Sequence, residues 1–139
     1  MYPISNLKVS TMADSKTTLK ELKAHMAAFV KERDWEQFHS PKNLSMSISI
    51  EAAELMEKFQ WCDIEASKNE LTNDFQEVKH EIADIFCYLL SFCNLYDIDI
   101  SDAVTEKLAL TARKYPVDKV HGSYKNAEII KKSLKKSVK

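Results

Sequence analysis

The chain has 139 residues, of which 45% are hydrophobic, and twenty Lys and Arg oppose twenty-one Asp and Glu to give a formal charge of −1. This near-neutral balance gives no electrostatic argument for binding nucleic acid or an anionic membrane. A single glycine and three prolines argue against sheet folds and against glycine-rich loops that wrap phosphates. We therefore expect one all-α domain, large enough to bury a core without metal or disulfide staples.

The cysteines and the apolar segments bear on the compartment. The chain has three cysteines, Cys62, Cys87 and Cys93, and two of them lie in an apolar helical run. The odd number and this placement indicate neither a disulfide framework nor a zinc site. The first residues contain no uninterrupted apolar segment typical of a signal peptide, and no stretch approaches the roughly 20 apolar residues of a membrane span. We expect a protein of the reducing cytoplasm.

The first two helices are predicted over residues 19–33 and 41–60. Thr18 followed by Glu21 is a capping-box signature, and apolar residues then recur at helical spacing. Ser40 and Pro41 match an N-cap followed by a first-turn proline, which predicts the start of the second helix.

A polar loop over residues 62–73 is expected next, followed by a third helix that Asn73 can cap and that continues to about Tyr96. From Ile85 onward this helix is apolar almost all round, which predicts a central position contacted by several neighbours. Its expected buried residues are Phe75, Val78, Ile82, Ile85, Phe86, Leu89, Phe92 and Cys93. Ser101 can cap a fourth helix, which should stop before Tyr115-Pro116 because the residue preceding a proline disfavours helical geometry.

These helices define a predicted domain over residues 17–116. Residues 1–16 are expected to be a loosely ordered N-terminus, with Met12 as an alternative start. Residues 117–139 form a basic tail with seven lysines and a weak amphipathic run. Two interpretations of the tail stay open: a frayed, solvated helix, or a segment that makes oligomer contacts or attracts polyanions.

Two acidic pairs with the same spacing interrupt apolar helical segments. Glu51 and Glu54 lie along one edge of the apolar face of the second helix, and Glu81 and Asp84 lie along one edge of the apolar face of the third. The apolar face of the second helix consists of Leu44, Ile48, Ala52, Leu55 and Phe59, and the third helix carries Tyr88 beside its acidic pair and Glu77 behind it. Two helices packed antiparallel can therefore point four carboxylates into one space.

A hard divalent cation would relieve the repulsion within such a carboxylate cluster. Mg²⁺ takes oxygen ligands, keeps several waters and is commonly shared between carboxylates and substrate phosphates. Ferritin-like di-iron bundles use Glu-x-x-His on two helices, whereas this chain has Glu-x-x-Glu and Glu-x-x-Asp, which favours Mg²⁺ or Mn²⁺. Single Glu-x-x-Glu pairs are common on helix surfaces, so the prediction depends on two pairs that each border an apolar face.

Four segments carry a resemblance to a known family: ERDWEQFHSPKNL, EAAELMEKFQW, EIADIFCYLL and KLALTARKYP. Over roughly residues 19–118 the chain resembles the all-α nucleotide pyrophosphohydrolases of the MazG-like superfamily, most closely their dCTP pyrophosphatase branch. The resemblance implies a four-helix MazG-like bundle completed by a second protomer, as a homodimer or homotetramer. It also implies Mg²⁺-dependent hydrolysis of a nucleoside triphosphate to the monophosphate and pyrophosphate.

Residue by residue, Glu51, Glu54, Glu81 and Asp84 match the metal ligands of the family. The metal would neutralise phosphate charge and lower the pKa of a bound water, with Glu54 as the preferred acceptor of its proton. Lys107, Arg113 and Lys114 are candidates for holding phosphate oxygens, although a lysine at a helix end such as Lys114 is also ordinary dipole compensation.

The resemblance places Trp35 and Trp61 in the base pocket, where an indole can stack on a base, with His39 and Tyr88 nearby. The alternative is that both tryptophans close a subunit interface. Members of the branch often carry His where this chain has Met26 and Asn where it has Thr111, both near the nucleotide, so the preference for cytosine stays open. The competing hypotheses are a broader dNTP or dUTP pyrophosphatase and a catalytically silent helical dimer that binds nucleotides or a partner.

Overall fold

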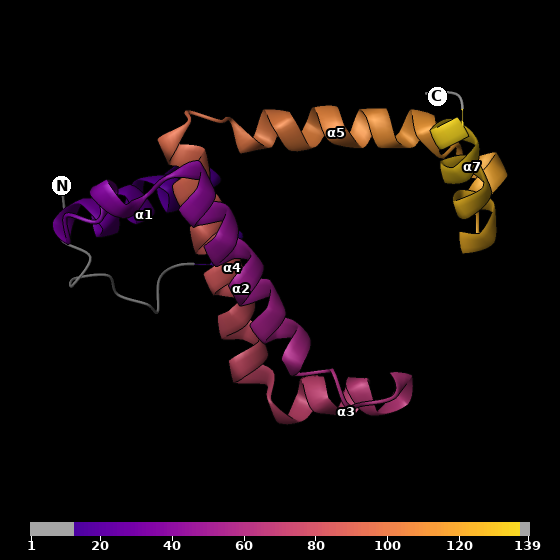
Figure 1. Cartoon of the computed structure of the whole chain (residues 1–139), viewed down its shortest axis with the longest axis horizontal. Coiled ribbons are helices and arrows are strands. Elements are labelled where there is room, and N and C mark those ends of the chain that lie inside the picture. Colours follow the sequence, from indigo (N-terminus) through magenta and orange to yellow (C-terminus); the bar gives the residue numbers. More distant parts are fainter. Residues whose placement is uncertain (1–12, 137–139) are drawn as a thin grey trace. The chain divides into compact units, whose positions relative to one another are not determined.

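The computed structural model describes residues 13–136, which form α-helices and one short 3-10 helix with no strand in that range. The elements are α1 (Leu19–Glu32), η3 (Glu36–Phe38), α2 (Pro41–Glu57), α3 (Ile64–Asn73), α4 (Phe75–Leu95), α5 (Ile100–Lys114), α6 (Val117–Val120) and α7 (Tyr124–Lys136) (Figure 1). The all-α prediction is confirmed. None of the described helices is long and apolar enough to cross a membrane.

The chain separates into two compact units on either side of the Ile98–Asp99 peptide, and each is described by itself. The predicted domain boundaries at residues 17 and 117 stay predictions. The expectations for residues 1–12, including Met12 as an alternative start, lie outside the described residues.

The starts of the first two helices follow the sequence signals. Thr18 accepts the backbone N–H of Glu21 at 3.2 Å, and the Glu21 carboxylate accepts the Thr18 backbone N–H at 2.7 Å, which completes the predicted capping box. Ser40 caps α2 by accepting the Asn43 N–H at 3.1 Å, with Pro41 in the first turn. Both predictions are confirmed.

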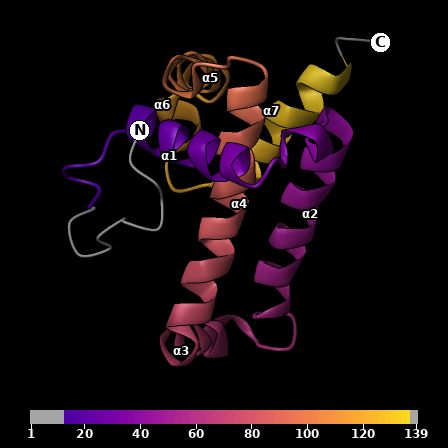
Figure 2. The same cartoon turned by 90° about the vertical axis from the view of Figure 1, so that its left-hand side faces the viewer.

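The core of the first unit lies between α1, α2 and α4. Helices α2 and α4 run side by side along their length (Figure 2), and Leu44, Val78 and Leu90 are among their buried apolar residues. Two hydrogen bonds join α1 to the end of α4 and to the turn that follows it: Asn94 Nδ2 on α4 donates to the Lys23 carbonyl, and Lys23 Nζ donates to the Ile98 carbonyl, each at 2.8 Å.

The predicted loop at residues 62–73 is wrong, because most of it is helix α3. Its sequence lacks the apolar stripe by which helices are recognised, yet its start is well capped: the Asp63 side chain accepts the Ala66 N–H at 2.7 Å. Within it, Lys68 pairs with Glu65 at i,i+3. The Asp63 cap therefore starts a helix that periodicity did not indicate, and the exposed Lys68–Glu65 pair adds little to its stability.

Three predicted helix boundaries also need correction. Helix α2 ends at Glu57, where turns replace the expected helix up to Gln60. Asn73 is the last residue of α3 and does not cap α4, which begins after Asp74. The fourth predicted helix, α5, is capped by Asp99, which accepts the Asp102 N–H at 3.0 Å, so Ser101 lies within its first turn.

Helix α4 is less covered than its sequence predicts. Of its expected buried residues, Val78 and Cys93 are buried, but Phe75 and Ile82 are 54% and 53% exposed, and Phe86 and Leu89 are also exposed. Within the first unit, α4 packs on α1, α2 and α3, and these neighbours leave part of its surface open. The apolar surface of α4 thus exceeds what the other helices of the first unit cover.

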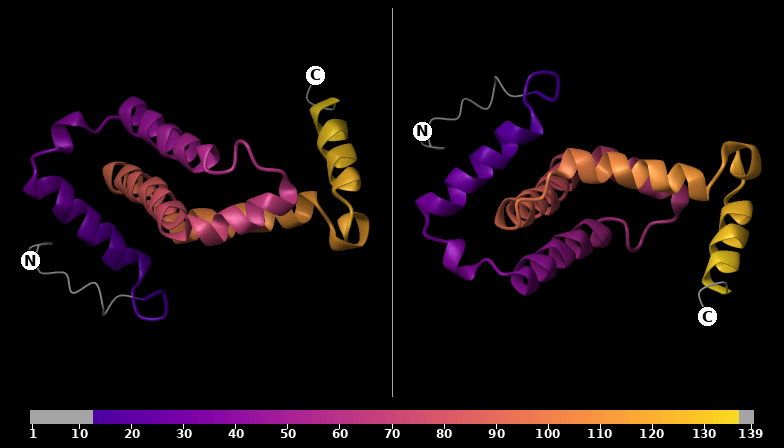
Figure 3. Two further views of the ribbon diagram at one scale, coloured as in Figure 1. Left: turned by 90° about the horizontal axis from the view of Figure 1, so that it is seen from below. Right: turned by 90° about the horizontal axis from the view of Figure 1, so that it is seen from above.

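The second unit contains α5, α6 and α7. Helix α5 is continuous to Lys114 and stops before Tyr115-Pro116, as predicted (Figure 3). The basic tail begins with the single turn α6, and Gly122, at φ 65°, lets the chain turn into α7. Asn126 Nδ2 donates to the Lys119 carbonyl at 3.0 Å, which ties α7 to α6.

Candidate metal centre

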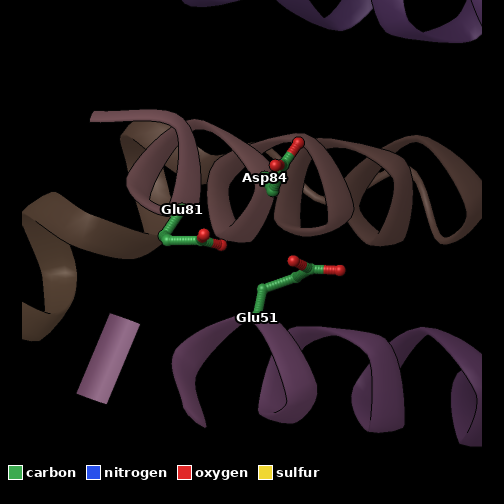
Figure 4. Close-up of side chains that lie close together, drawn as sticks. All are labelled: Glu51, Glu81 and Asp84. Atoms are coloured by element: carbon green, nitrogen blue, oxygen red, sulfur yellow. The ribbon is translucent and has the colours of Figure 1, made fainter. Parts of the chain in front are cut away.

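Three carboxylates from two helices converge in the first unit. Glu51 projects from α2 toward α4, on which Glu81 and Asp84 lie (Figure 4). One oxygen of each lies within 4.8 Å of the others; Glu51 and Glu81 are half-buried and Asp84 is exposed. We call these three residues the acidic cluster.

Helical geometry explains the convergence. Glu81 and Asp84 are three residues apart, so they lie on one face of α4 about one turn apart. On α2, Glu51 follows the buried Leu44 by seven residues, a spacing that returns to nearly the same face after two turns. Packing α2 against α4 through Leu44 therefore brings Glu51 opposite the acidic pair of α4.

Glu54 is not brought into the acidic cluster, although the sequence groups it with the other three carboxylates. Its side chain is exposed, and its oxygens are outside the set that lies within 4.8 Å. Its charge still acts on the site, because it helps to raise the pKa of Glu51. Its roles as metal ligand and proton acceptor stay predictions.

The electrostatics of the acidic cluster favour a bound cation. The pKa of Glu51 lies above its ordinary value, first because the carboxyl is partly desolvated and then because Glu54, Asp84 and Glu81 repel its charge. Three carboxylate donors without nitrogen or sulfur suit a hard divalent cation. Ligand oxygens on opposite sides of Mg²⁺ lie about 4 Å apart, so the spacing of these oxygens needs only small side-chain adjustments.

Replacing Glu51 by Gln is expected to raise the melting temperature of the metal-free protein at pH 7. A carboxyl whose pKa is raised by folding favours the folded state below its unfolded pKa, and this stability is lost as the pH rises through the folded pKa. At pH 7 the ionised Glu51 therefore destabilises the folded state, and Gln, which carries no charge, removes this destabilisation. The increase in melting temperature should vanish below about pH 4, where the carboxyl is protonated in both the folded and the unfolded state. The measurement is thermal unfolding in EDTA at both pH values, with Glu65→Gln as the control. A lower melting temperature of Glu51→Gln at pH 7 would contradict the expectation.

The structure distributes the predicted base-pocket residues over several places. Trp61 is 90% exposed and lines a cleft of about 490 Å³ at the end of α2. His39 lines a different cleft, of about 370 Å³, together with Val30, Ser91 and Asn94. Trp35 packs edge-to-face on Phe29 with ring centroids 5.8 Å apart, and the half-buried Tyr88 follows Asp84 on α4 by one turn. The first unit alone therefore does not gather the two tryptophans into one pocket.

The remaining predicted binding residues lie on α5, in the second unit. They are Lys107, Thr111, Arg113 and Lys114. Lys114 Nζ stands 5.1 Å from the centroid of the Tyr115 ring, and the first three have no described interaction that assigns them a role. Met26, one of the departures from the branch, is half-buried on α1.

One charged pair near the acidic cluster was missed by the sequence reasoning. Lys58 Nζ donates to the Glu77 carboxylate, which links the end of α2 to the first turn of α4. The spacing contained a signal, since Lys58 follows Glu51 by seven residues and Glu77 precedes Glu81 by four. Only the alignment of α2 against α4 shows that the two side chains meet.

Comparisons with known proteins agree with this architecture. The profile of the MazG-like family matches residues 46–129, which include all three residues of the acidic cluster. The crystal structure of a pyrophosphatase from Archaeoglobus fulgidus is similar with a TM-score of 0.70 and 39% sequence identity, covering 76% of this chain and 98% of that one.

Two mammalian relatives extend the comparison. The chain is 35% identical over 111 residues to dCTP pyrophosphatase 1 of Bos taurus, which covers 78% of this chain and 66% of the bovine protein. It is 35% identical over 101 residues to dCTP pyrophosphatase 1 of Homo sapiens, which covers 71% of this chain and 59% of the human protein. The chain thus spans about two thirds or less of the length of these relatives. With the family profile matched over more than half of its length, the chain belongs to the MazG-like family.

Proposed function

We propose that this chain is a Mg²⁺-dependent nucleoside triphosphate pyrophosphohydrolase that converts dCTP or modified dCTP analogues to the monophosphate and pyrophosphate. The observation that carries the proposal is the acidic cluster, whose oxygens from α2 and α4 lie within 4.8 Å of one another. The similarity to two proteins named dCTP pyrophosphatase 1 and to an archaeal pyrophosphatase supports the reaction and the choice of nucleotide.

Glu51, Glu81 and Asp84 are the residues that would hold the cation, Mg²⁺ or Mn²⁺ as its substitute. When bound, such a cation neutralises phosphate charge and makes a water more acidic. Glu54, one helical turn after Glu51 and exposed, would accept a proton from the attacking water. The water oxygen then bonds to phosphorus as the phosphoanhydride bond breaks and pyrophosphate leaves.

We infer two groups of nucleotide-binding residues, one for the base and one for the phosphates. We infer that Trp61 and Trp35 provide stacking surfaces for the base, with His39 and Tyr88 near it, because indole rings bind any base through its π-face. On α5, Lys107, Arg113 and Lys114 would bind phosphate oxygens, and Thr111 would lie beside the nucleotide. Charged donors on a helix can replace the backbone cradle of a glycine-rich loop, and this chain has one glycine.

We also infer that a second copy of the chain completes the protein, as a homodimer or homotetramer. Ile82, Phe86 and Leu89 recur on one face of α4 and are 53%, 38% and 40% exposed. On α5, Val104 and Leu108 are 49% and 64% exposed. Exposed apolar residues that share one helix face are typical of an interaction surface, and we assign this surface to a second copy of the chain.

The test of the proposal is a panel of triphosphates: dCTP, 5-methyl-dCTP, dUTP, dTTP, dATP and dGTP, each with Mg²⁺ and with EDTA. We expect pyrophosphate release that requires Mg²⁺ and whose kcat/KM is highest for the two cytosine nucleotides. Equal values for all six would retain the chemistry and show a broader dNTP pyrophosphatase, consistent with Met26 and Thr111 replacing residues usual in the branch. Binding without release would instead indicate a silent nucleotide-binding oligomer.

A further inference from the structure

The ion pair between Lys58 and Glu77 lies beside the proposed reaction centre. Lys58 Nζ donates to the Glu77 carboxylate; the lysine side chain is 23% exposed and the glutamate side chain 61% exposed. Glu77 raises the pKa of Lys58, and Glu81 and Asp74 add smaller effects in the same direction. Glu81 belongs to the acidic cluster, so the Lys58 ammonium lies within electrostatic range of that cluster.

The ion pair and the acidic cluster form successive layers between the same two helices. Lys58 follows Glu51 by seven residues, which corresponds to about 10 Å along α2 on nearly the same face. Glu77 precedes Glu81 by four residues, about one turn of α4. A phosphate chain that began at the acidic cluster and ran toward the end of α2 would therefore pass Lys58.

A cleft at the end of α2 could hold the part of a ligand that extends from the acidic cluster past Lys58. Its volume is about 490 Å³, and Lys58 and Trp61 both line it. The other charged residues that line it, Glu57, Glu70 and Asp74, are acidic, so Lys58 is the only cation among the described lining residues. Among the described residues of this cleft, Lys58 is therefore the positive group available to an anionic ligand whose base stacks on Trp61.

We propose that Lys58 is a phosphate-binding residue, held by Glu77 in the nucleotide-free protein and transferred to a phosphate oxygen when the triphosphate binds. This inference rests on the proposed function of the acidic cluster. The transfer costs little, because an ion pair with an exposed partner such as Glu77 contributes little stability in water. Contact with a phosphate oxygen is a charge-assisted hydrogen bond and is the stronger of the two interactions.

Matched substitutions distinguish the roles of Lys58 and Glu77. Lys58→Gln removes the phosphate contact, whereas Glu77→Gln removes only the competing carboxylate. The control is Lys68→Gln, which removes a lysine of the same charge from the exposed pair with Glu65 on α3. Calorimetry of the full-length proteins with the α,β-imido analogue of dCTP and Mg²⁺ gives the dissociation constants, and steady-state hydrolysis of dCTP gives kcat and KM.

We expect Lys58→Gln to weaken binding of the analogue about tenfold or more and to raise KM with a smaller effect on kcat. Glu77→Gln should leave binding unchanged or tighten it by up to about fivefold, and Lys68→Gln should change nothing. Equal weakening by Lys58→Gln and Glu77→Gln would show a purely structural ion pair and overturn the inference, as would wild-type binding by Lys58→Gln.

The same experiment separates this inference from the proposed function. Wild-type protein that binds the analogue but does not release pyrophosphate from dCTP would refute the proposed reaction, while the dissociation constants of the variants would still decide the role of Lys58. Failure of the wild-type protein to bind the analogue would overturn both.

Discussion

Asp84→Asn and Glu81→Gln should each lower kcat/KM for Mg²⁺-dependent pyrophosphate release from dCTP by at least about a hundredfold. Substituting a residue that only hydrogen-bonds to a metal ligand already lowers metal affinity or activity about 10- to 100-fold, and these two residues are proposed as ligands themselves. Each substitution removes one of three charged oxygen donors that lie within 4.8 Å of one another, and the remaining amide oxygen is a weaker ligand for a hard cation. Neither residue supports the fold through a described hydrogen bond or ion pair, so helix content should be retained.

The control for these substitutions is Glu65→Gln on α3, which removes an exposed carboxylate outside the acidic cluster. It should keep wild-type kcat/KM and the same circular dichroism spectrum as the two cluster variants. Near-wild-type turnover by both Asp84→Asn and Glu81→Gln would exclude the acidic cluster as the reaction centre. Partial recovery of either variant at high Mg²⁺ would instead agree with weakened metal binding.

Phe86→Glu is expected to dissociate the proposed oligomer and, with it, to abolish most of the activity. Phe86 lies between Ile82 and Leu89 on the exposed apolar face of α4. In a symmetric dimer each substitution is present twice in the interface. Burying an unpaired carboxylate costs several kcal/mol, in addition to the lost apolar contact of Phe86, so two substitutions should raise the dissociation constant at least about a hundredfold.

Light scattering during size-exclusion chromatography, with dCTP turnover measured on the same samples, checks this expectation. Ile64→Glu on α3 is the matched control, because Ile64 is 81% exposed and lies outside the apolar face of α4. We expect the control to keep the mass and the turnover of the wild-type protein. Phe86→Glu with wild-type mass and turnover would show that this face of α4 is not an interface.

The sequence predicts elements well where local chemistry determines them. The Thr18–Glu21 capping box and the Ser40-Pro41 start of α2 depend on atoms within a few residues, and the structure shows both. Helix α3 was missed because its start depends on the Asp63 cap, and its sequence lacks the apolar periodicity that identifies helices. The exposure of Ile82 and Phe86 was missed because the apolar pattern of α4 shows that its surface needs to be covered. The pattern does not show which part of the protein covers it.

The acidic cluster was predictable in composition but not in full geometry. Three-residue spacing puts Glu81 and Asp84 on one face of α4, and likewise pairs Glu51 with Glu54 on α2. Which member of a pair faces the other helix depends on the rotation and register of α2 against α4. That packing selects Glu51 and leaves Glu54 outside the cluster, and the same register creates the Lys58–Glu77 pair.

The most direct test of the central claim is the identity of the products that wild-type protein forms from dCTP, followed by ³¹P NMR with Mg²⁺ and then with excess EDTA. We predict the resonances of dCMP and pyrophosphate in equal amounts with Mg²⁺, no inorganic phosphate, and no turnover in EDTA. Formation of dCDP and inorganic phosphate, or turnover that persists in EDTA, would contradict the assignment of the acidic cluster as the metal centre of a nucleotide pyrophosphohydrolase.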